Sequence, residues 1–209
     1  MPTPAPNDHV GRLVLFGAPG AGKGTQGRRL AESFGVPLIA SGDLLRRAIQ
    51  SGTPLGTTVR RFVDAGDLVP DELAVEIVLD RLGQPDANDG FILDGFPRTL
   101  GQARALDDRL AAEGRPLERV VELRVPTDQL VDRIAGRAGI DGRSDDRADV
   151  AQHRLQVYLT QTAALTEYYR AHGILASIDG VGTVDEVAHR IDDALRRLGP
   201  PDEAPATLS

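Results

Sequence analysis

The sequence contains no cysteine, and this absence removes several kinds of chemistry at once. Its 209 residues include no thiol for a disulfide, for a Cys-ligated zinc site or for a catalytic nucleophile. The sequence also lacks any apolar run near the roughly 20 residues that a membrane-spanning helix needs, and its start, MPTPAPNDHV, has no apolar segment typical of a signal peptide. We therefore expect a cytoplasmic protein with no zinc and no membrane partner.

Basic residues are the minority among the charged ones, with 24 bases against 31 acids and a formal net charge of −7. Because a nucleic-acid binder carries a basic surface, this balance argues against a nucleic-acid partner. Lysine is almost absent, since all of the bases except Lys23 are arginines. A lone ammonium group inside a Gly-rich segment indicates a specific use for a compact positive charge.

Short apolar runs alternate with helical patterns along the chain. The apolar runs predict five strands, at residues 12–16, 37–40, 91–94, 120–125 and 174–178. Helical periodicity predicts helices from the Gly-rich segment to about residue 33, and at 70–82, 99–113, 127–137, 150–171 and 184–198. This alternation is typical of an α/β protein in which helices cover both faces of a five-stranded parallel sheet, making three layers.

Two stretches interrupt the alternation. Residues 41–69 contain two short helical patterns, which predict a small helical insertion, and the polar residues 139–149 predict an exposed loop. Both are candidates for parts that move over a site. The Pro-rich ends, 1–10 and 200–209, predict disordered tails on a core that spans 11–199.

A Gly-rich segment, GAPGAGKGT at 17–25, follows the first predicted strand and opens a helix. In this context glycines allow backbone N–H groups to surround an anion, and the helix N-terminus adds the positive end of its dipole. Lys23 is then placed to reach the outer phosphates of a nucleoside triphosphate. Gly24 occupies the position where a Ser or Thr usually contacts Mg²⁺, so that the first hydroxyl belongs to Thr25.

Four motifs together resemble those of the adenylate kinases, the ATP:AMP phosphotransferases. They are GAPGAGKGTQ at 17–26, SGDLLR at 41–46, DGFPRT at 94–99 and GRSDDR at 142–147, and they occur in the family's order. The resemblance covers about residues 11–198, and DGFPR is its most discriminating motif. It implies the fold of the P-loop nucleoside monophosphate kinases, with an NMP-binding insertion at 40–69 and a short lid at 137–147.

The resemblance also implies roles for individual residues. ATP would be bound by Gly20, Ala21, Gly22, Lys23, Gly24, Thr25, Arg137 and Gly182. AMP would be bound by Ser41, Arg46, Asp67, Leu68, Val69, Gly95, Phe96, Pro97, Arg98, Gln102, Arg143 and Arg154. The catalytic set would be Lys23, Asp94, Arg98, Arg137, Arg143 and Arg154.

The chemistry of such a transfer fits these residue types. The acceptor oxygen belongs to a phosphate that is already ionised, so that charge neutralisation by arginines and Mg²⁺ matters more than a general base. Mg²⁺ is expected to arrive with ATP, without direct protein ligands, and to contact Asp94 through water. Gln102 follows Arg98 by about one helical turn and could present its amide to the adenine edge.

The motifs leave two other functions open. A kinase for UMP, CMP or another nucleoside monophosphate would share the scaffold, and neither Gln102 nor the short lid excludes it. A nucleotide-binding regulator that transfers nothing is the more distant alternative, and the second set of anion ligands argues against it. The main prediction is an enzyme that maintains adenine nucleotide balance, with ATP, AMP and ADP as its partners. It is expected to be a monomer, because no pattern indicates a partner face.

Overall fold

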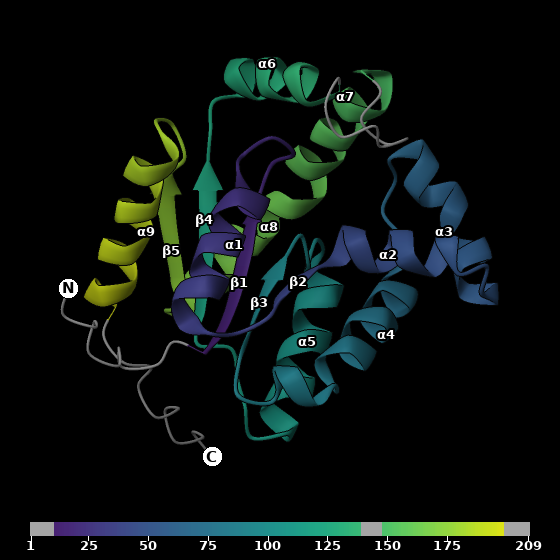
Figure 1. Ribbon diagram of the computed structural model, residues 1–209, viewed down its shortest axis with the longest axis horizontal. Coiled ribbons are helices and arrows are strands. Elements are labelled where there is room, and N and C mark those ends of the chain that lie inside the picture. The colour runs from purple at the N-terminus through teal and green to yellow at the C-terminus, as the bar shows by residue number, and fades with distance from the viewer. Residues whose placement is uncertain (1–10, 139–147, 199–209) are drawn as a thin grey trace.

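The computed structural model describes residues 11–138 and 148–198 (Figure 1). The strands are β1 (Arg12–Gly17), β2 (Leu38–Ala40), β3 (Phe91–Asp94), β4 (Arg119–Arg124) and β5 (Leu175–Asp179). The helices are α1 (Lys23–Phe34), α2 (Ser41–Gln50), α3 (Pro54–Ala65), α4 (Asp71–Leu82), α5 (Leu100–Ala112), α6 (Thr127–Ala138), α7 (Ala148–Val157), α8 (Ala163–Ala171) and α9 (Val184–Arg197), with a 3-10 turn η1 (Pro85–Ala87) and a π-helical turn η3 (Tyr158–Thr162). The expected tails, 1–10 and 200–209, lie outside the described residues.

The five strands form one parallel sheet in the order β2-β3-β1-β4-β5. This confirms the predicted α/β fold with its five-stranded sheet. After β1, the next two strands in the sequence, β2 and β3, lie on one side of β1 in the sheet, and the last two, β4 and β5, lie on the other side. In open sheets of this kind, ligands bind outside the carboxyl ends of the strands where the order reverses. A ligand-binding site is therefore expected at the loops after β1 and β3.

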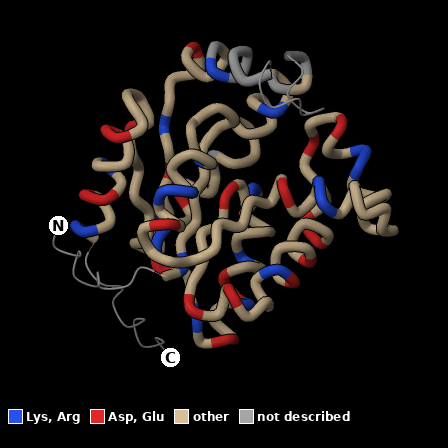
Figure 2. Tube along the Cα trace, viewed as in Figure 1, with Lys and Arg blue, Asp and Glu red and all other residues tan. Residues whose placement is uncertain are grey.

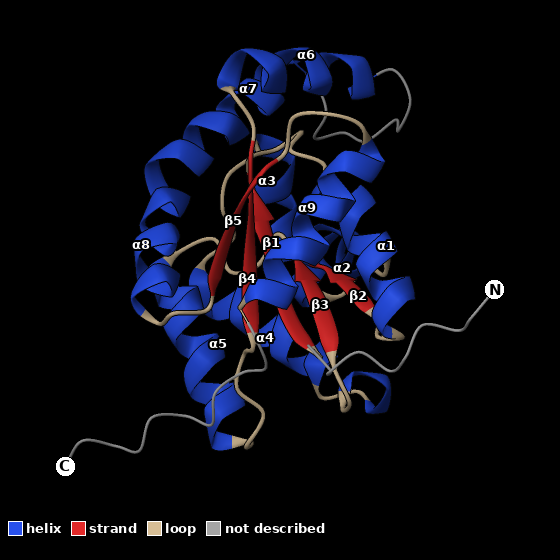
Figure 3. Ribbon diagram, turned by 90° about the vertical axis from the view of Figure 1, so that its left-hand side faces the viewer, coloured by secondary structure: helices blue, strands red, loops and turns tan. Residues whose placement is uncertain are grey.

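The sheet is buried on both faces, because successive side chains of a strand point to opposite sides. Leu13 and Leu15 of β1 face the layer that contains α1 and α9, whereas Val14 and Phe16 face the layer of α4, α5 and α8. All four side chains are at most 2% exposed. Figure 3 shows the resulting three layers, with the sheet between α5 and α8 on one side and α1 on the other.

Three helices begin at a threonine whose hydroxyl accepts a backbone N–H, which satisfies one of the unpaired donors of a first turn. Thr53 caps α3, Thr99 caps α5 and Thr183 caps α9. At α9 the side chain of Glu186 accepts the backbone N–H of Thr183, which completes a capping box. The cap at Thr99 also positions residues of the site described below.

Helices α2, α3 and α4 lie between β2 and β3 in the sequence, and α5 lies between β3 and β4. The two helical segments predicted within 41–69 are α2 and α3, which lie to one side of the sheet (Figure 1). The two helices approach closely at Gly56, where an added Cβ would overlap the backbone carbonyl of Ala48. Only a residue without a side chain allows this approach.

One predicted helix, 150–171, is interrupted. The structure divides it into α7 and α8, with the π-helical turn η3 between them. Thr162, at the end of this turn, is buried, and its hydroxyl donates a 3.1 Å hydrogen bond to the backbone carbonyl of Arg98. Side-chain periodicity could not reveal the turn, because one extra residue in an otherwise regular helix leaves no compositional signal.

Acidic and basic residues are interspersed along the helices around the sheet (Figure 2). Within the described ranges, no helix combines the length and the apolar character that a membrane crossing requires.

Candidate active site

The Gly-rich segment forms the loop between β1 and α1. Gly20 and Gly22 have positive φ angles of 82° and 96°, which glycine adopts without steric strain. The ammonium group of Lys23 is folded back over this loop and donates hydrogen bonds to the carbonyls of Gly17 at 2.8 Å and Ala18 at 3.0 Å. The loop therefore joins a helix N-terminus to a positive charge, which is an arrangement suited to phosphate.

Asp94 ends β3 beside this loop. The strand register aligns Asp94 with Leu15 of β1, and a Cβ built at Gly24 would lie 3.6 Å from Asp94 Oδ2. The position that often carries a hydroxyl in such loops thus faces a carboxylate. The described residues contain no group of three or more His, Cys, Asp and Glu side chains that could hold a metal ion. A single carboxylate suits a Mg²⁺ ion that keeps most of its waters.

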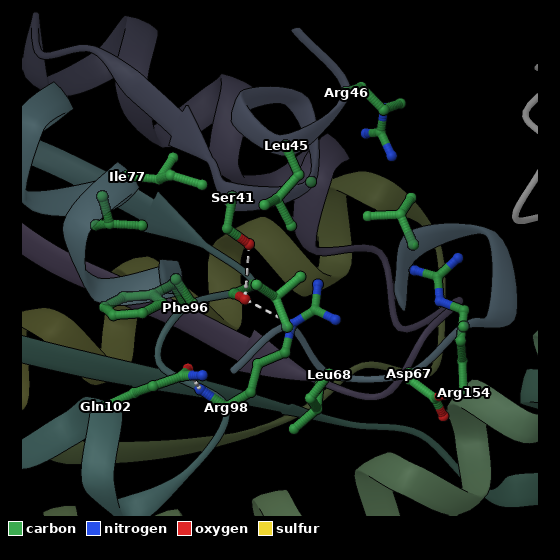
Figure 4. A pocket seen from close by; sticks show the side chains of 17 residues that line it. Ser41, Leu45, Arg46, Asp67, Leu68, Ile77, Phe96, Arg98, Gln102 and Arg154 are labelled. Carbon is green, nitrogen blue, oxygen red and sulfur yellow. Dashed lines mark hydrogen bonds between the residues drawn. The ribbon is translucent and has the colours of Figure 1, made fainter. Parts of the chain in front are cut away.

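A pocket opens between α2, the segment after α3 and the loop after β3 (Figure 4). Ten of the residues predicted for the acceptor nucleotide line it: Ser41, Arg46, Asp67, Leu68, Val69, Gly95, Phe96, Arg98, Gln102 and Arg154. Apolar side chains for which no role was predicted complete the wall, among them Leu45 of the SGDLLR motif, and Ile77 and Val78, which lie outside all four motifs. These residues come from α2 and α4, where they read as ordinary apolar positions of a helix.

The backbone carbonyl of Gly95 fixes two polar residues of this pocket. It accepts a hydrogen bond from Ser41 Oγ at 2.8 Å and another from Arg98 Nε at 2.7 Å (Figure 4). Gly95 has a φ of 74°, and a Cβ there would lie 3.2 Å from Ser41 Oγ and 3.3 Å from Arg98 Nη2. A glycine is therefore required at this position both by the backbone conformation and by the close approach of its neighbours.

Gln102 is 2% exposed and is held at both ends of its amide. Its Oε1 accepts the backbone N–H of Arg98 at 2.7 Å, and its Nε2 donates to Asp71 Oδ1 at 2.8 Å. The prediction that Gln102 presents an amide to the base therefore applies only to the remaining lone pair of Oε1 and the remaining N–H of Nε2. Asp71 is a residue that sequence reasoning missed, since it lies outside all four motifs.

A second pocket lies between the Gly-rich loop and the α7–η3 segment. It is lined by Phe16, Gly17, Pro19, Lys23, Gly66, Leu68, Gly95, Pro97, Arg98, Arg154, Val157, Tyr158 and Thr162. Burial raises the pKa of Tyr158 to about 12, and the charge of Glu122 acts in the same direction, so this phenol stays neutral. Arg98 and Arg154 line both pockets and form part of the wall between them.

Two further predicted acceptor residues, Arg46 and Asp67, have side-chain partners within the protein. Arg46 donates to Asp43 at 2.6 Å, one turn earlier on α2. Asp67 Oδ1 lies 2.6 Å from Nε2 of His153, which belongs to no motif. The second contact connects the segment after α3 to α7, the helix that carries Arg154.

Gly182 lies in the turn between β5 and α9 with a φ of 129°. Where this turn meets α9, Gln26 Nε2 of α1 donates to the carbonyl of Val184, the first residue of α9, at 2.9 Å. Arg133 of α6 reaches the carbonyl of Gly180 at 3.3 Å. The turn is thus adjacent both to the start of α1 and to α6.

Two more residues predicted to bind the donor nucleotide are Thr25 and Arg137, and Arg143 belongs to the predicted acceptor and catalytic residues. Thr25 lies in the first turn of α1, where its backbone N–H donates to the carbonyl of Gly22 at 3.1 Å. Arg137 belongs to α6, but its side chain is not among those described, and Arg143 lies outside the described residues. Their predicted roles stay predictions.

The sequence model of the family described as adenylate kinase matches residues 15–174. The chain belongs to the adenylate kinase family. Its relatives named adenylate kinase include proteins of Xylella fastidiosa (strain M12), Xanthomonas campestris pv. campestris (strain B100) and Micrococcus luteus, which are 51%, 50% and 47% identical to it. These matches cover 88%, 89% and 88% of this chain and 98%, 100% and 90% of the relatives. The adenylate kinase resemblance of the four motifs is confirmed.

Proposed function

We propose that the protein transfers the terminal phosphoryl group of MgATP to AMP, reversibly, to give two molecules of ADP, and that it thereby maintains the balance of adenine nucleotides. The observation that carries this proposal is the shared wall of the two pockets. Arg98 and Arg154 border both of them. A phosphoryl group that passes between two nucleotides would cross at these guanidinium groups, which stabilise the charge on its oxygens.

We assign the donor nucleotide to the pocket along the Gly-rich loop. The backbone N–H groups of this loop and the N-terminus of α1 would receive the phosphates. Lys23 would exchange its bonds to the carbonyls of Gly17 and Ala18 for bonds to phosphate oxygens. Asp94 fits a water-mediated contact to Mg²⁺, which supplies charge neutralisation when it is bound with ATP.

We assign AMP to the pocket of Ser41 and Gln102. Arg98 is held at its Nε by the Gly95 carbonyl, so its guanidinium is oriented in advance toward an anion in the pocket. Arg46 would exchange its bond to Asp43 for a bond to the AMP phosphate. Because that phosphate is already ionised, no side chain needs to remove a proton from the attacking oxygen.

The parts that close over the nucleotides belong to the same proposal. Residues 40–69, which contain α2 and α3, would move with AMP, and 137–147 would act as a short lid that brings Arg137 and Arg143 to the phosphates. The contact between His153 and Asp67 supports a coupling of these two parts, because it connects α7, which follows residues 137–147, to the segment 40–69.

The proposal is tested by incubating the protein with ATP, AMP and Mg²⁺ and separating the products. We expect two ADP formed per ATP consumed, and no comparable ADP when AMP is left out. Turnover of UMP or CMP under the same conditions measures the strictness of the acceptor site. Phosphate release without phosphorylation of AMP, or a higher kcat/KM for UMP or CMP than for AMP, would overturn it.

A further inference from the structure

We propose that Asp71 is a positioning residue that makes the acceptor site select a 6-amino purine over a 6-oxo purine. It acts by fixing which end of the Gln102 amide faces each neighbour. The inference rests on the proposed function, because it takes the pocket lined by Gln102 as the acceptor site. Asp71 does not line that pocket itself.

The amide of Gln102 lies between two groups of fixed hydrogen-bonding character. A backbone N–H can only donate, and Arg98 N–H points at Gln102 Oε1 at 2.7 Å. A carboxylate can only accept, and Asp71 Oδ1 receives Gln102 Nε2 at 2.8 Å. Rotating the amide by half a turn would place an N–H against an N–H and a carbonyl against a carboxylate, so both contacts would become repulsive.

This fixed orientation has a direct consequence for the base. With one lone pair of Oε1 and one N–H of Nε2 already engaged, the amide offers one acceptor and one donor in a set order. Adenine carries a donating 6-amino group next to the accepting N1, whereas a 6-oxo purine carries an accepting oxygen next to a donating N1–H. The two edges are complementary to opposite orientations of a glutamine amide.

The carboxylate of Asp71 is itself held in place. Its Oδ2 accepts the hydroxyl of Thr99 at 2.7 Å, and that hydroxyl also accepts the backbone N–H of Gln102 at 3.1 Å as the cap of α5. A Cβ added at Gly101 would lie 2.5 Å from Asp71 Oδ2, which shows how closely α5 approaches the carboxylate. One carboxylate thus joins the start of α4 to both the cap and the amide.

The first test compares Asp71→Asn with the wild type. An asparagine can present either an oxygen or an NH₂ to Gln102, so it removes the penalty against the rotated amide at this end. We expect the kcat/KM ratio of AMP to inosine monophosphate to fall about tenfold, the effect of one hydrogen-bond mismatch. The fall should come mainly from a gain with inosine monophosphate, which a merely structural defect cannot produce, and the KM of ATP should not change.

The matched control is Glu72→Gln, because Glu72 is the next residue of α4, is exposed and also contributes negative charge at that helix N-terminus. Its AMP to inosine monophosphate ratio should equal that of the wild type. A second variant, Gly101→Ala, keeps the charge of Asp71 but displaces its carboxylate, and should lower the same ratio.

The outcomes separate the two proposals. A wild type that does not phosphorylate AMP contradicts the proposed function. If the wild type does phosphorylate AMP but the ratio stays the same in Asp71→Asn and Gly101→Ala, Asp71 does not determine base selection and the inference is overturned. A lower melting temperature with an unchanged ratio also overturns it, since Asp71 would then only stabilise the junction of α4 and α5.

Discussion

The hydroxyl of Thr162 holds the backbone of Arg98 from the side opposite to Gln102. Thr162 Oγ1 donates to the carbonyl of Arg98 at 3.1 Å, while Gln102 Oε1 accepts the N–H of the same residue at 2.7 Å. The first contact comes from the π-helical turn η3 and the second from α5. A π-helical turn frequently marks a functional site, and here it brings a hydroxyl to an arginine that lines both pockets.

Replacing this hydroxyl tests its contribution. In Thr162→Val the part-buried carbonyl of Arg98 loses a donor, so we expect the free energy of unfolding to fall by about 1–3 kcal/mol. We also expect kcat/KM to fall for both nucleotides, because Arg98 is less well oriented. Thr160→Val is the control, since Thr160 lies in the same turn but is exposed, and its hydroxyl donates to the carbonyls of Gln156 and Val157 in the preceding helical turn. Equal effects of the two variants would contradict the prediction.

Lys23→Met should abolish turnover without unfolding the protein. We expect kcat to fall by at least about a hundredfold, the usual effect of removing a group that stabilises transition-state charge. The melting temperature should change little, because Lys23 is a partly exposed first residue of α1 and its ammonium group bonds to backbone carbonyls of the preceding loop. Arg29→Met is a control that also removes one positive charge from α1, in an exposed pair with Asp185. Retained activity in Lys23→Met would argue strongly against the assigned donor site.

The contact between α2 and α3 gives a prediction specific to the AMP side. A methyl group in Gly56→Ala would overlap the carbonyl of Ala48 and force the two helices apart. We expect a loss of about 1–3 kcal/mol in the free energy of unfolding and a higher KM for AMP, with a smaller change in the KM for ATP. Gly83→Ala is a suitable control, because a Cβ there makes only ordinary contacts, from 3.5 Å. Parallel changes in both KM values would be inconsistent with this expectation.

The pH dependence of stability should contain a contribution from Asp107. Burial raises its pKa from 3.8 to about 6, while the hydroxyl of Tyr168 donates to it at 2.9 Å. Between these two pKa values the folded protein binds more protons than the unfolded one, so stability falls as pH rises through this window, by at most about 3 kcal/mol. Above about pH 6 the stability contributed by protonated Asp107 is lost completely.

Asp107→Asn should remove this loss. Denaturant unfolding at several pH values between 4 and 7 should show the wild type becoming less stable relative to Asp107→Asn as pH increases. Asp108→Asn, which changes the adjacent exposed carboxylate, controls for general charge effects. A constant difference in unfolding free energy across this range would show that Asp107 does not titrate there.

The sequence predicted the parts of the fold that depend on local pattern. The five strands and the Gly-rich loop were found because a buried parallel strand and a helix-opening glycine segment have strong compositional signals. Ten of the residues predicted for the acceptor nucleotide line one pocket, and they were named only by likeness to the family, so their roles stay predictions. The turn η3 was missed because one extra residue within a longer helix leaves no signal in the side-chain pattern. Asp71 was missed because its role depends on a contact with Gln102, 31 positions away in the sequence.

The two carbonyl contacts of Lys23 also affect how the protein can be handled. The chain has a single ε-amino group, and this group is folded onto the Gly-rich loop. Amine-reactive dyes and resins therefore have only two targets, this side chain and the chain's first residue. A preparation coupled to a surface through its amines should retain activity only in those molecules that are attached by the terminus.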